Sequence, residues 1–332
     1  MRIFGTLPTG EEIYEFTLRS GDASASIISY GATLRSLRVF GREVVAGFDT
    51  LDDYMQNRTF HGATVGRVCN RIVGGTFTMD GRTYELTKNN GGLHCLHGGS
   101  DGYSNKAWEV LSHTDRSVTL GYTSPDGQSG FPGEVRIEAT YTLTGTALTV
   151  HYRAVPKAKT PIMLTNHAYF NLGGFGCEVL DYTLKVYAED YSEVGADRLP
   201  TGRRVSVAET PLDFSSPRRI GERMAESPIG YDHNFVISPT SHRESEYGKL
   251  GLAAEVRGEG ICLKAYTDQP GVQLYVPKSE VKTPLRGGVR QIAYGAFCLE
   301  AQIEPDCVSR GIGFVDAGEL YESTTVYEAT RE

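Results

Sequence analysis

Residues 134–154 read "EVRIEATYTLTGTALTVHYRA", and this stretch decides the fold class. Apolar or aromatic side chains occupy every second position from Val135 to Leu143, and again from Leu148 to Ala154. A period of two predicts strands with one buried face. Because the short segment "TGT" at 144–146 joins the two runs, the sequence predicts a β-hairpin.

Alternating runs recur along the whole chain, and turn-forming segments such as "MDGR", "SPDGQSG" and "TDQPG" separate them. These runs are 25–39, 75–86, 117–123, 182–191, 261–267, 271–276 and the closing 318–329. Helical periodicity is confined to "TLDDYMQ" (50–56), with Thr50 as a candidate N-cap, and "PRRIGERMAE" (217–226). No linker, charge block or repeat divides the chain. The sequence therefore predicts an all-β protein, a single domain over residues 1–332 built as a large antiparallel β-sandwich with few short helices.

Composition narrows the class of partner. The 332 residues carry a net charge of −8, with acids and bases mixed along the chain, which argues against a nucleic acid or an anionic membrane. No segment approaches the ~20 apolar residues that span a bilayer, and the first residues do not resemble a signal peptide. Six cysteines are scattered without a C-x-x-C pair, which favours reduced thiols and a cytoplasmic protein. A small neutral ligand fits best.

Histidines stand in two unusual contexts. In "GGLHCLHGG" (91–99), His94 and His97 bracket Cys95, but a metal site needs three or four ligands and no second cluster exists, so we predict no metal. The flanking glycines instead suggest tight turns that present one imidazole to a ligand. In "LTNHAYFNLGG" (164–174), a strand would place His167 and Tyr169 on one face. A lone histidine there is more often structural than catalytic.

Acidic and basic side chains complete the set of candidates. Glu300 lies in the apolar run "GAFCLEAQ", where burial would raise its pKa and suit it to act as a general base. The alternative is a rim glutamate paired with a cation. Asn70 and Arg71 are adjacent in "VCNRIVGG", and the ordinary role of such an arginine is a surface ion pair. Asp232 lies in "GYDHNF", where the ordinary role of an aspartate is to cap a turn. Since G-x-G-x-x-G, P-loop and G-x-S-x-G motifs are absent, this set favours proton transfer on a polyhydroxyl ligand without a cofactor.

A dozen segments in order resemble the aldose 1-epimerase, or galactose mutarotase, family. They include "SYGATLRSL", "GFDTLDDY", "GRVCNRIVGGTFTMDGRTYEL", "LHGG", "SPDGQSGFPGEV", "TNHAYFNLGG", "LPTGR", "PLDF", "GYDHNF", "QPGVQLY", "FCLEAQIEPD" and "GELYESTTVY". Together they run from about residue 28 to residue 327. The resemblance implies a galactose mutarotase-like β-sandwich that interconverts the α and β anomers of free aldohexoses such as glucose and galactose, with no cofactor and no metal.

The resemblance also implies roles for seven residues. Glu300 corresponds to the family's base, His167 to its acid and His97 to a second active-site histidine. The residues that match its contacts to sugar hydroxyls are Asn70, Arg71, Asp232 and Gln273. The division of labour between the two histidines rests on the resemblance alone. Tyr169 or Phe170 is expected to supply an apolar floor. The implied partner is a small aldohexose, with no nucleic acid or membrane, for a monomer or homodimer.

The chain departs from the family at three places, and the third, a loop expected at the rim of the cleft, bears on the sugar preference. His94 replaces a usual Asn, Ala301 a usual Thr, and Val276-Pro277-Lys278 a usual Gly-Asn pair. The sequence also allows three other functions. A glycoside hydrolase would use Glu300 and Asp232 as its carboxylate pair, and a sugar-binding module would not catalyse. An epimerase for sugar phosphates would need extra cations, for which Arg67, Arg71 and Lys278 are the candidates.

Overall fold

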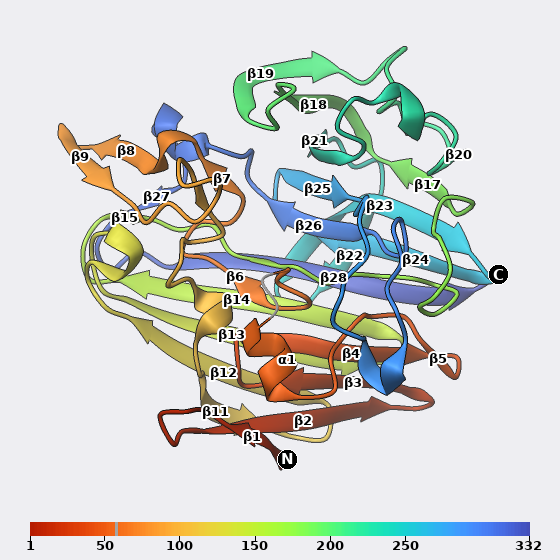
Figure 1. Ribbon diagram of the computed structural model, residues 1–332, viewed down its shortest axis with the longest axis horizontal. Coiled ribbons are helices and arrows are strands. Elements are labelled where there is room, and N and C mark those ends of the chain that lie inside the picture. Colours follow the sequence, from red (N-terminus) through yellow and green to blue (C-terminus); the bar gives the residue numbers. More distant parts are fainter. Residues whose placement is uncertain (57–58) are drawn as a thin grey trace.

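A ten-stranded antiparallel sheet forms the centre of the computed structural model, which describes residues 1–56 and 59–332 (Figure 1). The predicted hairpin lies within it, with Thr144 opposite Ala147 across the turn. The C-terminal strand is the neighbour of the hairpin, so the end of the chain is built into the middle of this sheet. In order across the sheet, the strands are β11 (Glu109–His113), β12 (Ser117–Ser124), β13 (Val135–Thr144), β14 (Ala147–Pro156), β28 (Tyr321–Arg331), β24 (Ile261–Thr267), β23 (Gly248–Gly258), β17 (Thr183–Val186) and β20 (Arg218–Arg219), with β22 (His242–Ser245) also paired to β23.

Two five-stranded antiparallel sheets accompany the large one. The N-terminal sheet is β1 (Arg2–Thr6), β2 (Glu12–Ser20), β3 (Ala23–Ile28), β4 (Thr33–Val39) and β5 (Arg42–Glu43). The other has the order β19 (Pro200–Ser206), β18 (Ala188–Val194), β21 (Asp232–Ile237), β25 (Gly271–Tyr275) and β26 (Cys298–Gln302). The remaining strands form two-stranded pairs: β6 (Thr64–Val65) with β16 (Thr165–Asn166), β7 (Arg71–Ile72) with β10 (Cys95–Leu96), β8 (Thr76–Met79) with β9 (Arg82–Glu85), and β15 (Thr160–Pro161) with β27 (Phe314–Val315).

Alternating burial explains why the sheets pack together. In β13 the five apolar positions from Val135 to Leu143 are fully buried, while the polar residues between them stay partly exposed. One continuous hydrophobic cluster joins this face to both smaller sheets, for example through Leu37 and Leu299. Burying each such side chain stabilises the fold by about 1.5–3 kcal/mol. The predicted antiparallel β-sandwich with few short helices is confirmed.

Of the two predicted helices, one is confirmed and one is wrong. The first is α1 (Leu51–Gln56), where the Thr50 hydroxyl accepts from the Asp53 backbone N–H and the Asp53 carboxylate accepts from the Thr50 N–H, a reciprocal capping box. Residues 217–226 instead begin as β20, whose Arg218 pairs with Leu184, and end in a 3₁₀ turn, Met224–Glu226. Pairing with a neighbouring strand has overridden local helical preference. Other 3₁₀ turns are Val73–Gly75, Tyr103–Asn105, Gln128–Gly130, Arg286–Gly288 and Cys307–Arg310. Within the described ranges no helix is long and apolar enough to cross a membrane.

The stretch 164–174 contains little regular strand, only the two residues of β16. Its side chains still divide between two environments. Leu164, Ala168 and Phe170 belong to the main core, whereas Tyr169 belongs to a separate cluster on the other side. Backbone bonds in both directions between the segments 62–63 and His167 hold it in place. The alternation of side chains along 164–174 therefore predicted their environments correctly, although only two of these residues form a strand.

Candidate active site

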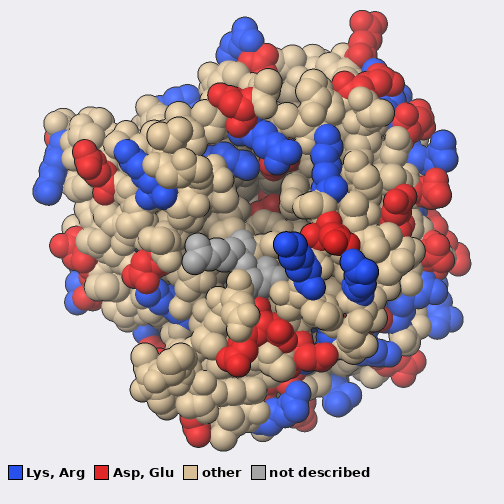
Figure 2. All heavy atoms as spheres, in the orientation of Figure 1, with Lys and Arg blue, Asp and Glu red and all other residues tan. Residues whose placement is uncertain are grey.

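All seven candidate side chains line one cavity of about 210 Å³, here called the central cavity. The face seen in Figure 2 is hollowed near its centre, with basic side chains along the rim. In Figure 1 the strands β7, β21, β25 and β26, which carry several of the seven residues, lie together in the upper half of the molecule. The described lining residues are Thr59, Phe60, Asn70, Arg71, Leu96, His97, His167, Tyr169, Arg198, Asp232, Gln273, Tyr275 and Glu300.

Three adjacent strands position the acidic wall of the cavity. Glu300 on β26 lies directly opposite Gln273 on β25, and β25 pairs in turn with β21, which begins at Asp232. Gln273 Nε2 donates to Asp232 Oδ1 at 2.7 Å, and Arg71 lies 3.5 Å from the other oxygen of that carboxylate. From the large sheet below, the Tyr327 hydroxyl donates to the carbonyl of Leu299, next to Glu300. The wall is thus fixed by sheet register and by a core tyrosine.

A strained turn presents His97 to the cavity. Both Asn70 and His97 have left-handed backbone conformations, and the Asn70 N–H donates to His97 Nδ1 at 3.1 Å. In a neutral imidazole the ring proton then lies on Nε2. The next residue, Gly98, has φ +85°, and a Cβ there would lie 1.8 Å from the Gly66 carbonyl oxygen. Only glycine fits, in agreement with the turns predicted from the glycines around "LHCLH".

His167 lies between aromatic rings beside Glu300. Its ring stacks on Tyr169 at 5.0 Å between centroids and on Phe60 at 5.9 Å. His167 Nε2 is 3.7 Å from Glu300 Oε1, while Nδ1 lies 3.8 Å from Cys298 Sγ. At 3.7 Å the nitrogen and oxygen lie side by side without a direct hydrogen bond. Both can therefore reach neighbouring atoms of one ligand.

Burial shifts the proton affinities of these groups in opposite directions. It raises the pKa of Glu300 well above its usual value, and the nearby Asp232 charge raises it further while Arg71 lowers it. Burial also lowers the pKa of His167 to about 4 and that of His97 well below its ordinary value. A dry cavity disfavours charge on acid and base alike, so the neutral forms of both kinds of group are stabilised.

Two buried acceptors face this region without a partner. Among the residues described, Glu300 Oε2 and Gln273 Oε1 make no hydrogen bond although neither atom is exposed to solvent. A buried polar atom left unpaired costs about 1–3 kcal/mol. Both residues line the central cavity, on opposed positions of β25 and β26, so both oxygens are available to the polar groups of a ligand.

Comparison with known proteins agrees with this geometry. The sequence model of the aldose 1-epimerase family matches residues 14–328. The chain is 38% identical to the galactose mutarotase of Bos taurus, over 98% of this chain and 97% of the relative. It belongs to the aldose 1-epimerase family. A second relative, the aldose 1-epimerase of Escherichia coli K12, is 31% identical over 98% of this chain and 97% of its own.

Solved structures extend the likeness to the whole fold of this aldose 1-epimerase family member. A GalM/aldose epimerase homologue from C. elegans superposes with a TM-score of 0.87 at 29% identity, covering 96% of this chain and 99% of the other. Galactose 1-epimerase from Lactobacillus acidophilus also reaches a TM-score of 0.87, at 26% identity, covering 99% and 98%. The resemblance predicted from the sequence is confirmed.

The structure separates the H-C-x-H residues from one another. His94 Nδ1 accepts from the Gly74 N–H and fixes a turn, whereas Cys95 is buried in a hydrophobic cluster. Only His97 of the three lines the central cavity. There one ring nitrogen of His97, one of His167 and a carboxylate oxygen of Glu300 lie within 4.8 Å of one another, close enough to hold a divalent cation. The absence of a metal in this family member therefore stays a prediction.

Two of the three candidate cations lie outside the central cavity. Arg67 is 1% exposed, and its guanidinium donates to the carbonyls of Pro132 and Gly133 and to the Ser124 hydroxyl. Lys278 packs against Gly230. Neither is among the described residues that line the central cavity. This removes two of the three cations on which the sugar-phosphate alternative relied.

Sequence reasoning missed several lining residues. Phe60 and Arg198 carried no recognised pattern, and both lie in loops. Tyr275 had a usable signal, since it follows Gln273 by two positions on β25 and so shares its face. Of the two alternatives for the floor, Tyr169 lines the cavity, whereas Phe170 is fully buried in the main core.

Proposed function

We propose that the protein interconverts the α and β anomers of free aldohexoses, with Glu300 as general base, His167 as general acid and His97 as a hydrogen-bond donor beside them. Membership of the aldose 1-epimerase family supports the reaction. The separation of 3.7 Å between Glu300 Oε1 and His167 Nε2 carries the assignment of the acid and base. The ring oxygen and the C1 hydroxyl of an aldose are bonded to the same carbon, so an acid and a base that lie side by side reach both.

The pair would pass one proton in each direction. Glu300 takes the proton of the C1 hydroxyl as the bond from C1 to the ring oxygen breaks, and the His167 imidazolium gives its proton to that oxygen. The open-chain aldehyde turns about its C1–C2 bond, and closure on the other face returns both protons. Because burial raises the pKa of Glu300 and lowers that of His167, the cavity favours the neutral pair, with the shared proton on Glu300. The charged pair that begins the step is the minor form, with that proton on His167, and ring opening converts it into the neutral pair.

The remaining candidates would bind the other sugar hydroxyls. Asp232 is held as an acceptor by Gln273 and Arg71, and the unpaired Gln273 Oε1 is available to a hydroxyl donor. His97 Nε2–H would donate near C1, because its Nδ1 already accepts from Asn70. Each hydroxyl of a buried sugar needs such a partner, since an unpaired polar group is costly.

Optical rotation of freshly dissolved α-D-galactose and α-D-glucose tests the proposal. Acceleration over buffer supports anomer interconversion, and the faster of the two sugars gives the preference. None of the departures at His94, Ala301 and Val276-Pro277-Lys278 is among the described residues that line the central cavity. Protein treated with a chelator should keep its full rate if no metal takes part. A rate lost to the chelator and restored by a divalent cation would assign one to His97, His167 and Glu300.

A glycoside hydrolase is the second candidate, because Glu300 and Asp232 line the same cavity. Both oxygens of Asp232 are already engaged by Arg71 and Gln273, which disfavours a nucleophile or a water-activating base. Hydrolysis of a chromogenic galactoside would support this candidate over ours.

We further propose a cytoplasmic protein that acts as a monomer or homodimer. All six cysteines are free thiols, five of them buried, which favours a reducing compartment. Fractionation of the native cells would test the location, and sedimentation of the purified protein the assembly.

A further inference from the structure

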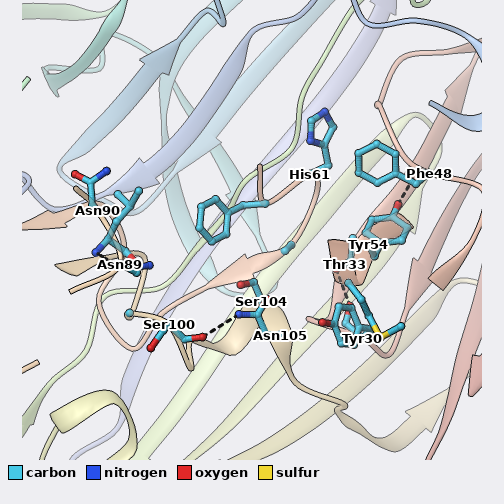
Figure 3. Close-up of a pocket in the computed structure, with 15 residues that line it drawn as sticks. Tyr30, Thr33, Phe48, Tyr54, His61, Asn89, Asn90, Ser100, Ser104 and Asn105 are labelled. Atoms are coloured by element: carbon cyan, nitrogen blue, oxygen red, sulfur yellow. Dashed lines mark hydrogen bonds between the residues drawn. The ribbon is translucent and has the colours of Figure 1, made fainter. Parts of the chain in front are cut away.

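A second and larger cavity adjoins the central one (Figure 3). Its volume is about 520 Å³, more than twice that of the central cavity. Phe60 and Leu96 line both, so these side chains form a shared wall. The described lining residues include Tyr30, Phe48, Tyr54, Asn89, Asn90 and Ser104.

The lining of this second cavity combines aromatic rings with uncharged polar groups. None of the described lining residues is Asp, Glu, Lys or Arg. In Figure 3, Tyr30, Phe48 and Tyr54 gather on one side, and Asn89, Asn90 and Ser100 lie on the other. Amides and hydroxyls both donate and accept hydrogen bonds, as sugar hydroxyls do, while aromatic faces cover the apolar side of a sugar ring. A charged ligand would find no counter-charge among these side chains.

One buried hydroxyl in the second cavity has no hydrogen-bond partner among the described residues. Ser104 is 6% exposed, and within the described part of the chain its Oγ makes no hydrogen bond. The polar groups around it are held in place. Asn89 exchanges two hydrogen bonds with the backbone of Leu96, and Asn105 Nδ2 donates to the Ser100 carbonyl. These bonds orient the polar side chains of the second cavity, and the buried Ser104 hydroxyl is left to pair with a ligand.

The second cavity also contacts the catalytic histidines through its walls. Phe60 packs against His97 with ring centroids 4.7 Å apart and against His167 at 5.9 Å. On the other side, His61 stacks on Tyr169 at 3.9 Å, and Tyr169 stacks in turn on His167. A ligand in the second cavity would therefore lie one side chain away from the acid of the central cavity.

We propose that the second cavity is a binding site for a neutral saccharide. The ligand is either a separate sugar or the non-reducing part of a reducing oligosaccharide whose reducing end occupies the central cavity. The uncharged polar lining, the volume and the unpaired Ser104 hydroxyl are common to both sources. Only the second source rests on the proposed anomer interconversion.

The first arm of the test measures binding without turnover. Methyl β-D-galactopyranoside cannot open its ring, and calorimetric titration gives its number of sites per chain. Ser100 is exposed and lines the second cavity, so Ser100→Trp should fill the opening. Ser112, exposed on β11 and outside both described linings, provides the matched control Ser112→Trp. For a separate sugar, Ser100→Trp loses one site that the control keeps, and Ser104→Ala weakens that site about two- to tenfold, the range of one net hydrogen bond.

The second arm compares KM for lactose with KM for D-glucose, the sugar at the reducing end of lactose, in each variant. For an oligosaccharide that spans both cavities, Ser100→Trp raises the KM for lactose relative to that for glucose, and Ser112→Trp does not. Asn105→Trp repeats both arms if Ser100→Trp melts early, since Asn105 is also exposed at this cavity. An unchanged site count together with an unchanged KM ratio overturns the proposal. If the wild type fails to mutarotate galactose, the proposed function fails, but the first arm can still be read.

Discussion

His61 is the residue from which the acid sensitivity of this fold can be predicted most directly. It is 2% exposed, its Nδ1 lies 2.6 Å from the Thr59 hydroxyl and its Nε2 lies 2.9 Å from Gln291 Oε1. Burial lowers its pKa from 6.5 to about 3. The folded protein therefore keeps His61 neutral at pH values where the unfolded chain takes up a proton. We predict that His61→Gln removes this penalty.

The size of the effect follows from the two pKa values. A histidine with a depressed folded pKa contributes stability that is present above its unfolded pKa and lost as the pH falls below it. Over the interval of about 1.5 pH units from 6.5 down to 5, His61 is protonated in the unfolded chain but stays neutral in the folded protein. At about 1.4 kcal/mol per unit this is about 2 kcal/mol. At pH 7.5 the same difference is close to zero.

Urea unfolding of the wild type and of His61→Gln at pH 7.5 and pH 5 measures the effect. The variant starts less stable because it loses the stacking on Tyr169, but its deficit should shrink by about 2 kcal/mol at pH 5. His242→Gln, at an exposed position of β22, is the matched control for the substitution itself. A deficit for His61→Gln that is the same at both pH values, or grows on acidification, would refute the reasoning.

Three further predictions concern buried charge. Arg67→Met leaves the carbonyls and hydroxyls around the guanidinium without donors, so urea unfolding should show a loss of about 3 kcal/mol or more; a wild-type midpoint would contradict this. Asp232→Asn removes a charge that raises the pKa of Glu300, so the acidic limb of kcat/KM should move to lower pH while KM rises; a limb that stays in place would disprove the coupling. Glu300→Gln removes a carboxyl with a raised pKa, whose ionisation costs folding energy above its ordinary pKa of 4.5. The melting temperature of the variant should therefore rise relative to that of the wild type as the pH increases above 4.5. A difference in melting temperature that does not change with pH would contradict the raised pKa of Glu300.

The sheets could be predicted because their pattern is local. The alternation from Val135 to Leu143 matches the alternating burial of β13, and the hairpin register follows from its short turn. The position of the C-terminal strand between β14 and β24 could not be predicted, because alternation identifies a strand but not its neighbours. The helix expected at 217–226 is wrong for a related reason, since the pairing of Arg218 with Leu184 is not encoded in the local sequence.

The site, like the order of the strands, could be predicted from the sequence only where the signal is local. Glu300 and His167 stand out in the sequence as polar residues in apolar runs, but their catalytic roles were predicted only from the family resemblance; the structure places both at one cavity. The rings that hold His167 come from distant or irregular segments, and the Gln291 that binds His61 is 230 residues away in the chain. Such contacts depend on the completed fold. The second cavity, which adjoins the first through Phe60, was not expected for the same reason.

The central claim is that Glu300 and His167 transfer protons during anomer interconversion, and polarimetry tests it most directly. Freshly dissolved α-D-galactose is followed with the wild type, Glu300→Gln and His167→Gln, each first shown to be folded by its melting temperature. We predict that the wild type accelerates the change in rotation and that each variant loses about 10²–10⁴-fold in rate. Variants as fast as the wild type, or a wild type no faster than buffer, would contradict the account.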